Sequence, residues 1–170
     1  RRSDEGLKKG IEYFKQAIDL DPNYGLAYAG LADCYTLLGV PDVAGTLAPR
    51  EAFPKAKVAA LKALEIDDAL AEAHNSLAFV RFWFEWDWPG AEREFKRAIE
   101  LNPNYATTRH WHAIYLMTVG RNEEAIAEMR RAQELEPLSL IINTNLGWAF
   151  YYARQYVQAI EQYKRTLEMD

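Results

Sequence analysis

The segment "AIDLDPNY" (residues 17–24) decides the fold of this chain, because three later segments repeat its wording at nearly regular distances. They are "ALEIDDAL" (63–70), "AIELNPNY" (98–105) and "AQELEPLS" (132–139), and a shorter "TLEMD" (166–170) comes last. The period is about 34 residues, and a small residue, an aromatic residue and Pro return at fixed offsets within it. Such a period is typical of helix–turn–helix repeats that stack into a solenoid.

The composition is that of a folded protein, with 49% hydrophobic and 26% charged residues among 170 and a net charge of −5. Lys and Arg form no stripe, so we expect no nucleic-acid partner. No apolar run approaches the roughly 20 residues that cross a membrane, so we expect no membrane partner. The single Cys34 excludes an internal disulfide and favours a reducing, cytoplasmic location. With no leader before Arg1 and a last motif cut at Asp170, we expect a piece of a longer protein.

The repeats can be numbered by placing the motif's Pro at position 32, so that position 1 follows three residues later. Positions 20, 24 and 27 then hold a small, a large and a small residue, which share one helical face and let two helices approach closely. The five triplets are Gly10–Phe14–Ala17, Ala56–Ala60–Ala63, Ala91–Phe95–Ala98, Ala125–Met129–Ala132 and Ala159–Tyr163–Thr166. This register predicts nine helices, over 4–20, 24–38, 50–66, 70–84, 89–101, 105–119, 122–135, 139–153 and 156–168.

The first-helix pattern of the Gly25 repeat adds Tyr28, Leu31, Ala32 and Tyr35 at positions 4, 7, 8 and 11. Together with the triplets, this pattern resembles the tetratricopeptide repeat family over essentially the whole chain. The resemblance implies an all-α, right-handed superhelical solenoid of about 4.5 repeats in a single array, 1–170. The array would comprise a partial repeat (1–24), a repeat with an insertion (25–70), two further repeats (71–105 and 106–139) and a truncated repeat (140–170).

Several features depart from that pattern. About 12 residues are inserted near 40–51, either as a partner contact or as a longer loop. One extra residue lies near "FVRFWFEWDWPG" (79–90), and it could belong to the helix or to the turn. Arg81, Arg109 and His112 stand at positions where this family usually has apolar or aromatic residues. The two arginines could pair with acidic residues of a neighbouring repeat, or the local register could differ from our numbering.

In this family the first helices of successive repeats line a concave groove that binds partners. Carried over position by position, the resemblance implies a groove formed by ten residues: Asp33, Leu37, Asn75, Phe79, His110, Ile114, Asn145, Trp148, Tyr151 and Tyr152. Large exposed aromatic side chains are common anchors for bound peptides. The alternative is that many of these rings fill the space between neighbouring helices. Trp86 is expected in a turn and exposed, and Trp88 between helices.

The wording of 83–106 also resembles the tetratricopeptide tails of large bacterial signalling proteins, which follow separate effector domains. The resemblance therefore implies a non-catalytic scaffold that binds a peptide or helix of a partner protein in its aromatic groove. The alternative is a structural module that dimerises or spaces effector domains through its last helix. We expect no enzyme activity and no cofactor, because no catalytic motif is visible. We also expect no metal, since His110 and His112 point to different sides of a helix.

Overall fold

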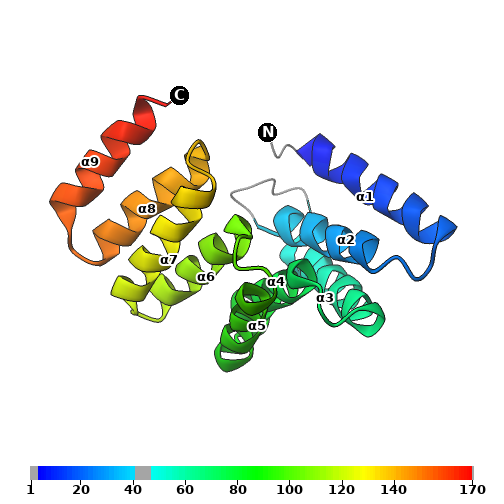
Figure 1. Cartoon of the computed structure of the whole chain (residues 1–170). Coiled ribbons are helices and arrows are strands. Elements are labelled where there is room, and N and C mark those ends of the chain that lie inside the picture. Colours follow the sequence, from blue (N-terminus) through cyan, green and yellow to red (C-terminus); the bar gives the residue numbers. More distant parts are fainter. Residues whose placement is uncertain (1–3, 41–46, 170) are drawn as a thin grey trace. The chain divides into compact units, whose positions relative to one another are not determined.

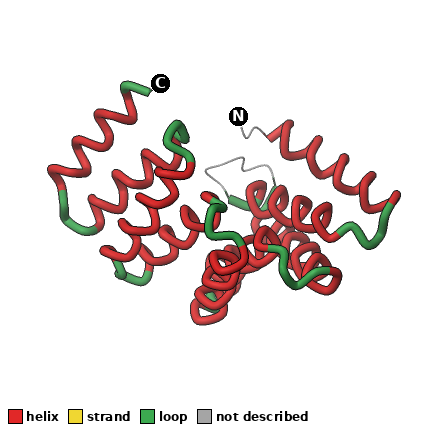
Figure 2. The backbone as a smooth tube through the Cα atoms, viewed as in Figure 1, coloured by secondary structure: helices red, strands yellow, loops and turns green. Residues whose placement is uncertain are grey.

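The computed structural model describes residues 4–40 and 47–169, and most of them are helical (Figures 1 and 2). No predicted helix end is displaced by more than one residue, although the predicted helix 70–84 finishes in a short π-helical segment, η1 (Arg81–Glu85). The α-helices of the described residues are α1 (Asp4–Leu20), α2 (Gly25–Leu38), α3 (Pro49–Ile66), α4 (Ala71–Val80), α5 (Trp88–Leu101), α6 (Ala106–Thr118), α7 (Asn122–Leu135), α8 (Leu140–Tyr152) and α9 (Tyr156–Leu167). The prediction of an all-α fold built from helix pairs is confirmed for this part of the chain.

The chain forms two compact units, Arg1–Asn102 and Pro103–Asp170. In the first unit, α2 packs against α1, α3 and α4, and α4 also packs against α3, α5 and η1. In the second unit, α6 packs against α7, α7 against α8, and α8 against α9. Each unit therefore stacks its helices in chain order, as repeat proteins do when neighbouring repeats bury one another's apolar faces.

Short local contacts set the helix ends. Oδ1 of Asp21 accepts a hydrogen bond from the backbone N–H of Asn23 at 3.0 Å, and Asp67 does the same with Ala69 at 2.9 Å. Such Asx turns end one helix and direct the chain into the next. Helix α3 begins at Pro49, where the missing backbone N–H leaves no intrahelical hydrogen bond unmade. Residues 41–46 of the predicted insertion lie outside the described residues.

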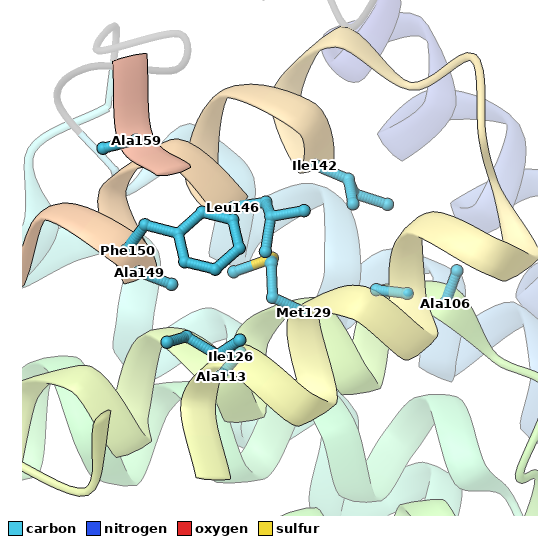
Figure 3. Packing of buried hydrophobic residues seen from close by; sticks show 10 residues of the cluster. Ala106, Ala113, Ile126, Met129, Ile142, Leu146, Ala149, Phe150 and Ala159 are labelled. Atoms are coloured by element: carbon cyan, nitrogen blue, oxygen red, sulfur yellow. The ribbon is translucent and has the colours of Figure 1, made fainter. Parts of the chain in front are cut away.

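The small–large–small triplets form the centre of both cores. Phe95 is fully buried in the first unit and Met129 in the second, and the Ala residues on either side of each are buried too. Figure 3 shows Met129 packed beside Leu146 and below Phe150 in the second unit. Gly147 lets α8 and α9 approach closely in the second unit, since a Cβ there would lie 2.4 Å from Tyr163. The predicted role of these positions in helix packing is thereby confirmed.

The extra residue of the 71–105 repeat lies within its first helix. In the next two repeats the turn closes when Leu116 O accepts the N–H of Arg121 and Phe150 O accepts the N–H of Gln155, both at 2.9 Å. The equivalent carbonyl, that of Arg81, accepts the N–H of Asp87 at 3.0 Å, one residue further along. A π-helical turn takes up one residue more than an α-helical turn. The second helix therefore keeps its predicted register despite the insertion.

Candidate functional site

The largest exposed aromatic surface of the second unit belongs to the last turns of α8. Trp148, Tyr151 and Tyr152 are 49%, 56% and 58% exposed, and all three are among the predicted groove residues. Tyr151 contacts Tyr152 edge-on, with ring centroids 5.7 Å apart, and its ring centroid also lies 5.8 Å from that of Tyr156. We call these four residues, Trp148, Tyr151, Tyr152 and Tyr156, the aromatic face. Tyr156, at the start of α9, was absent from the predicted set.

Hydrogen bonds hold the turn beneath the aromatic face in place. The side-chain amide of Asn122 donates to the backbone carbonyl of Tyr152 at 3.3 Å, and that of Gln155 donates to Glu123 at 3.1 Å. Both bonds link the α8–α9 turn to the first turn of α7. The rings of the aromatic face are thus exposed on a backbone that is fixed by a neighbouring repeat, and little backbone ordering would be required on binding.

Two predicted polar residues of this unit pair with each other below the surface. Nδ2 of Asn145 on α8 lies 2.7 Å from Nε2 of His110 on α6, and both residues are buried. Their hydrogen bond joins two successive first helices, and neither side chain offers much area to a partner. Ile114 is half-buried. Of the predicted residues in the second unit, only the three aromatic ones are exposed.

The four predicted groove residues of the first unit are more enclosed. Leu37, Asn75 and Phe79 are buried, and Asp33 is half-buried. Phe79 stacks on the exposed ring of Trp83, with centroids 5.8 Å apart. The predicted position pattern therefore brings these residues to the first helices without exposing most of them. Whether any of the ten residues binds a partner stays a prediction.

The tryptophans of the η1–α5 turn are both exposed. Trp86, the more exposed of the two, has a left-handed backbone with φ 60°, and its exposure was predicted. Trp88 was predicted to lie between helices, but its side chain is also exposed and lies 6.3 Å from Trp86, centroid to centroid. The prediction for Trp88 is therefore wrong; Tyr156, which begins α9 as Trp88 begins α5, is exposed as well.

A hollow of about 360 Å³ lies on the other side of α8. Its floor is formed by Leu146 and Phe150, and Arg130 lies over the Phe150 ring at 5.5 Å. These floor residues are each two positions from Trp148, which places them on the opposite face of the helix. The hollow is therefore separate from the aromatic face.

Three repeats share a polar arrangement at position 4. The side chain there reaches back to the backbone carbonyl six residues earlier and across to position 23 on the second helix of its own repeat. We call each set a position-4 clip. The three clips are His74 with Asp68 and Glu94, Arg109 with Pro103 and Glu128, and Asn143 with Pro137 and Gln162.

Arg109, one of the two arginines that depart from the family pattern, forms the second clip. Nε of Arg109 donates to Pro103 O at 2.8 Å, and Nη1 donates to Glu128 at 2.8 Å. Arg81 lies 3.5 Å from Glu94. Both acidic partners belong to the same repeat as their arginine, so the idea that a neighbouring repeat supplies them is wrong. The sequence signal for this pairing within one repeat is a polar residue at position 4 together with a polar residue at position 23.

The third clip is made of amides. Nδ2 of Asn143 donates to the carbonyls of Pro137 and Ser139, at 2.9 and 3.0 Å. Oδ1 of Asn143 then accepts from the amide groups of Gln133, at 2.6 Å, and Gln162, at 3.0 Å. Four groups are therefore satisfied around one buried side chain, and no net charge is buried.

The described residues contain no cluster of three or more His, Cys, Asp or Glu side chains that could hold a metal ion. Among the same residues, no helix has both the length and the apolar character needed to cross a membrane.

Comparison with known proteins agrees with this architecture. A family model described as tetratricopeptide repeat matches residues 111–170, and a second matches residues 7–24. The transcriptional regulator HilA of Salmonella paratyphi A is 26% identical over 149 residues, which cover 86% of this chain and 26% of the regulator. The chain thus spans about a quarter of the length of that relative.

Solved structures share the fold. A thermophilic tetratricopeptide protein of Thermus thermophilus matches with a TM-score of 0.74 and 18% identity, over 94% of this chain and 80% of that one. YrrB, described as a tetratricopeptide protein with an unusual peptide-binding site, matches with a TM-score of 0.63 and 22% identity, over 98% and 79%. At these identities the likeness concerns the fold alone. The helix pairs, the repeated packing triplets and the two family-model matches together make this chain a tetratricopeptide repeat protein.

Proposed function

We propose that this chain is a non-catalytic protein-binding module that holds a peptide or helix of a partner against the aromatic face. The observation that carries the proposal is the set of neighbouring, exposed rings at the end of α8. Tyr and Trp supply a large contact area at a low cost in side-chain entropy, and they are frequent hot spots of protein interfaces. Tetratricopeptide proteins commonly bind proteins, and the peptide-binding site in the description of YrrB supports the same class of ligand.

The surroundings of such a module can also be proposed. The likeness to HilA, a transcriptional regulator, supports a place within a larger bacterial regulatory or signalling protein. The net charge of −5 favours a protein partner over a nucleic acid. A single Cys favours the cytoplasm.

Photo-crosslinking from the aromatic face would test the proposal. A benzophenone amino acid at Tyr152 should capture the partner, whereas the same group at Tyr13, an exposed tyrosine of α1, should not. The affinity of the captured partner is then measured for the Trp148→Ala/Tyr152→Ala variant. We expect a loss of about tenfold or more, because exposed aromatic anchors contribute at least about 1.4 kcal/mol each when they are hot spots.

The control is Tyr13→Ala, which removes an exposed ring from the other unit. Circular dichroism and the unfolding midpoint should be the same for the variants and the native chain. If the affinity is unchanged in the double variant, or falls equally in the control, the aromatic face is not the binding site.

A second candidate, self-association, has one observation in its favour. Val157, Ile160 and Leu167 form exposed apolar positions on α9, whereas Ile126, which stands at the same repeat position as Ile160 on α7, is buried. An uncovered apolar face on a repeat is a surface on which a further helix could pack. Light scattering of the Ile160→Glu variant tests this idea. A mass that rises with concentration in the native chain and not in the variant would support it, and a constant native mass would rule it out.

A further inference from the structure

The three position-4 clips use three different chemistries in the same geometry. Arg109 is always charged, and Asn143 is always neutral, but the charge of an imidazole such as that of His74 changes near neutral pH. Since all three side chains make the same two contacts, the chain contains one titratable clip and two that do not depend on protonation near neutrality. The first unit therefore contains a clip whose charge can change near neutral pH.

Both ring nitrogens of His74 face acceptors. Nε2 lies 3.0 Å from the backbone carbonyl of Asp68, and Nδ1 lies 2.6 Å from Oε2 of Glu94. A carbonyl can only accept, so the proton of a neutral ring would be placed on Nε2. The lone pair of Nδ1 would then face a carboxylate, which is repulsive. Only the doubly protonated ring donates to both partners.

The carboxylate of Glu94 connects this ring to the π-helical segment. Its other oxygen lies 3.5 Å from Nη2 of Arg81, and Nη1 of the same guanidinium lies 3.6 Å from Asp87. Asp87 caps α5 by accepting a hydrogen bond from the N–H of Gly90 at 3.0 Å. Contacts thus run from His74 through Glu94 and Arg81 to the first turn of α5.

We propose that His74, Glu94 and Arg81 form a pH-responsive clip that holds α4, η1 and α5 together while His74 is protonated and loosens when the proton leaves. The exposed Trp83 lies within η1 and Trp86 follows it directly, so the clip also fixes the backbone that presents these two rings. The inference is independent of the aromatic face in the second unit.

The charges around His74 are consistent with this assignment. Burial alone would lower the pKa of His74, but the hydrogen bond with Glu94, the carbonyl of Asp68 and the negative charge of Glu94 outweigh it and raise the pKa above 6.5, although Arg97 acts against them. Burial alone would raise the pKa of Glu94, yet the hydrogen bond from His74 and the charge of Arg81 hold it below 4.5.

The other elements that pack against α4 carry charged side chains as well. In α2 the charged side chain is Asp33. In α3 the pairs are Lys55 with Glu51, Lys62 with Glu65, and Lys57 with Glu85 of η1, and Arg50 lies in its first turn. Of the side-chain types on these elements, the imidazole is the one whose ordinary pKa lies near neutrality, so the proposed response is assigned to His74.

The sign of the effect follows from linkage. Because the folded pKa of His74 lies above 6.5, its contribution to stability is complete below pH 6.5 and is lost as the pH rises through the folded pKa. Glu94 contributes above pH 4.5, and this contribution is lost as the pH falls through its lowered folded pKa. All contacts of the clip are therefore formed at pH values between the folded pKa of Glu94 and the folded pKa of His74.

The direct test is a titration of the native 170-residue chain by two-dimensional NMR of the imidazole nitrogens. The chain has three His, and the His74→Asn variant assigns the relevant signal by its absence. We expect His74 to titrate above 6.5 and to carry protons on both nitrogens at about pH 6. A His74 that titrates at or below 6.5, or that carries one ring proton at about pH 6, would overturn the proposal.

Chemical unfolding supplies a second test with a matched pair of variants. Glu94→Gln and Glu128→Gln remove the carboxylate at the same repeat position, opposite His74 and Arg109 respectively. Between about pH 6 and about pH 8.5 the native chain should lose stability, Glu128→Gln should lose the same amount, and Glu94→Gln should lose clearly less. Equal losses in all three would overturn the proposal. If Glu94→Gln does not fold, the titration of the native chain decides alone.

Discussion

The 71–105 repeat and the 106–139 repeat connect their two helices by turns that differ in length by one residue. The turn of the 106–139 repeat is closed by the hydrogen bond from the N–H of Arg121 to Leu116 O, and it contains Gly120, whose φ is 79°. The turn of the 71–105 repeat is closed by the hydrogen bond from the N–H of Asp87 to Arg81 O. It contains the π-helical segment and Trp86, whose φ is 60°. In both repeats, the second helix buries its packing triplet completely. An inserted residue is thus absorbed where the backbone can bulge, and the packing that defines the repeat is unchanged.

The largest expected loss of stability comes from the buried residue at position 24, which both repeats share. Phe95→Ala and Met129→Ala each remove a fully buried side chain at position 24. We expect a loss of about 3–5 kcal/mol for Phe95 and about 2–5 kcal/mol for Met129 in the free energy of unfolding, because each change leaves a cavity. Denaturant unfolding with a tryptophan fluorescence readout measures both. If the Phe95 variant loses less than about 1 kcal/mol, the repeat with the wide turn is not packed as tightly as its neighbour.

The cap after the wide turn is the next difference. Asp87 accepts a hydrogen bond from Gly90, whereas Arg121, at the same place before α7, makes no side-chain cap. Asp87→Ala should therefore cost about 0.5–2 kcal/mol of stability, since an N-cap is lost together with the pairing to Arg81. Arg121→Ala serves as the control and should cost less than about 0.5 kcal/mol, because Arg121 makes no side-chain cap and its pair with Glu124 lies at the surface. Equal losses would contradict the assigned cap.

The narrow turn can be strained by a single methyl group. A Cβ at Gly120 would meet nothing within 4 Å, so Gly120→Ala tests backbone conformation without a steric clash. We expect a loss of about 1 kcal/mol, because an L-residue is disfavoured in the left-handed region. Thermal unfolding compares it with Ala153→Gly, a change beside the next turn. An unchanged midpoint for Gly120→Ala would mean that the turn has relaxed out of its left-handed conformation.

The smallest expected effect is an increase in stability. Arg154 holds the left-handed position of the α8–α9 turn with φ 61°, where the preceding repeat has Gly120. Arg154→Gly should raise the free energy of unfolding by up to about 1 kcal/mol, since Gly adopts this conformation without strain and the arginine side chain is exposed. A loss of stability would show that the Arg154 side chain makes a contact worth more than the strain that it imposes.

The sequence predicted the fold closely because the repeat period and the packing triplets are local properties of the chain. The predicted helix 122–135 has the same bounds as α7, and Ala125, Met129 and Ala132 are buried as their register requires. The position of the extra residue was left open, since a π-helical segment has no pattern of its own. It became visible only through the hydrogen bond from Asp87 to Arg81.

The candidate site was harder to predict than the fold. The family register identifies which side of a first helix a residue occupies, but the size of neighbouring side chains decides how much of it is exposed. Trp148 and Tyr152 are exposed, whereas Asn75 and Phe79, at similar register positions, are buried beneath adjacent side chains. Tyr156 was missed because its position usually belongs to a ring between helices, and here it extends the aromatic face.

The close approach of α1 to α2 has a practical consequence for the cysteine of the chain. A Cβ on Gly10 of α1 would lie 3.1 Å from Sγ of Cys34, so α1 covers the buried thiol of α2. A thiol reagent can reach Cys34 only after these helices separate locally. The labelling rate, measured against denaturant concentration, would therefore report how often α1 detaches, and it would do so without any engineered probe.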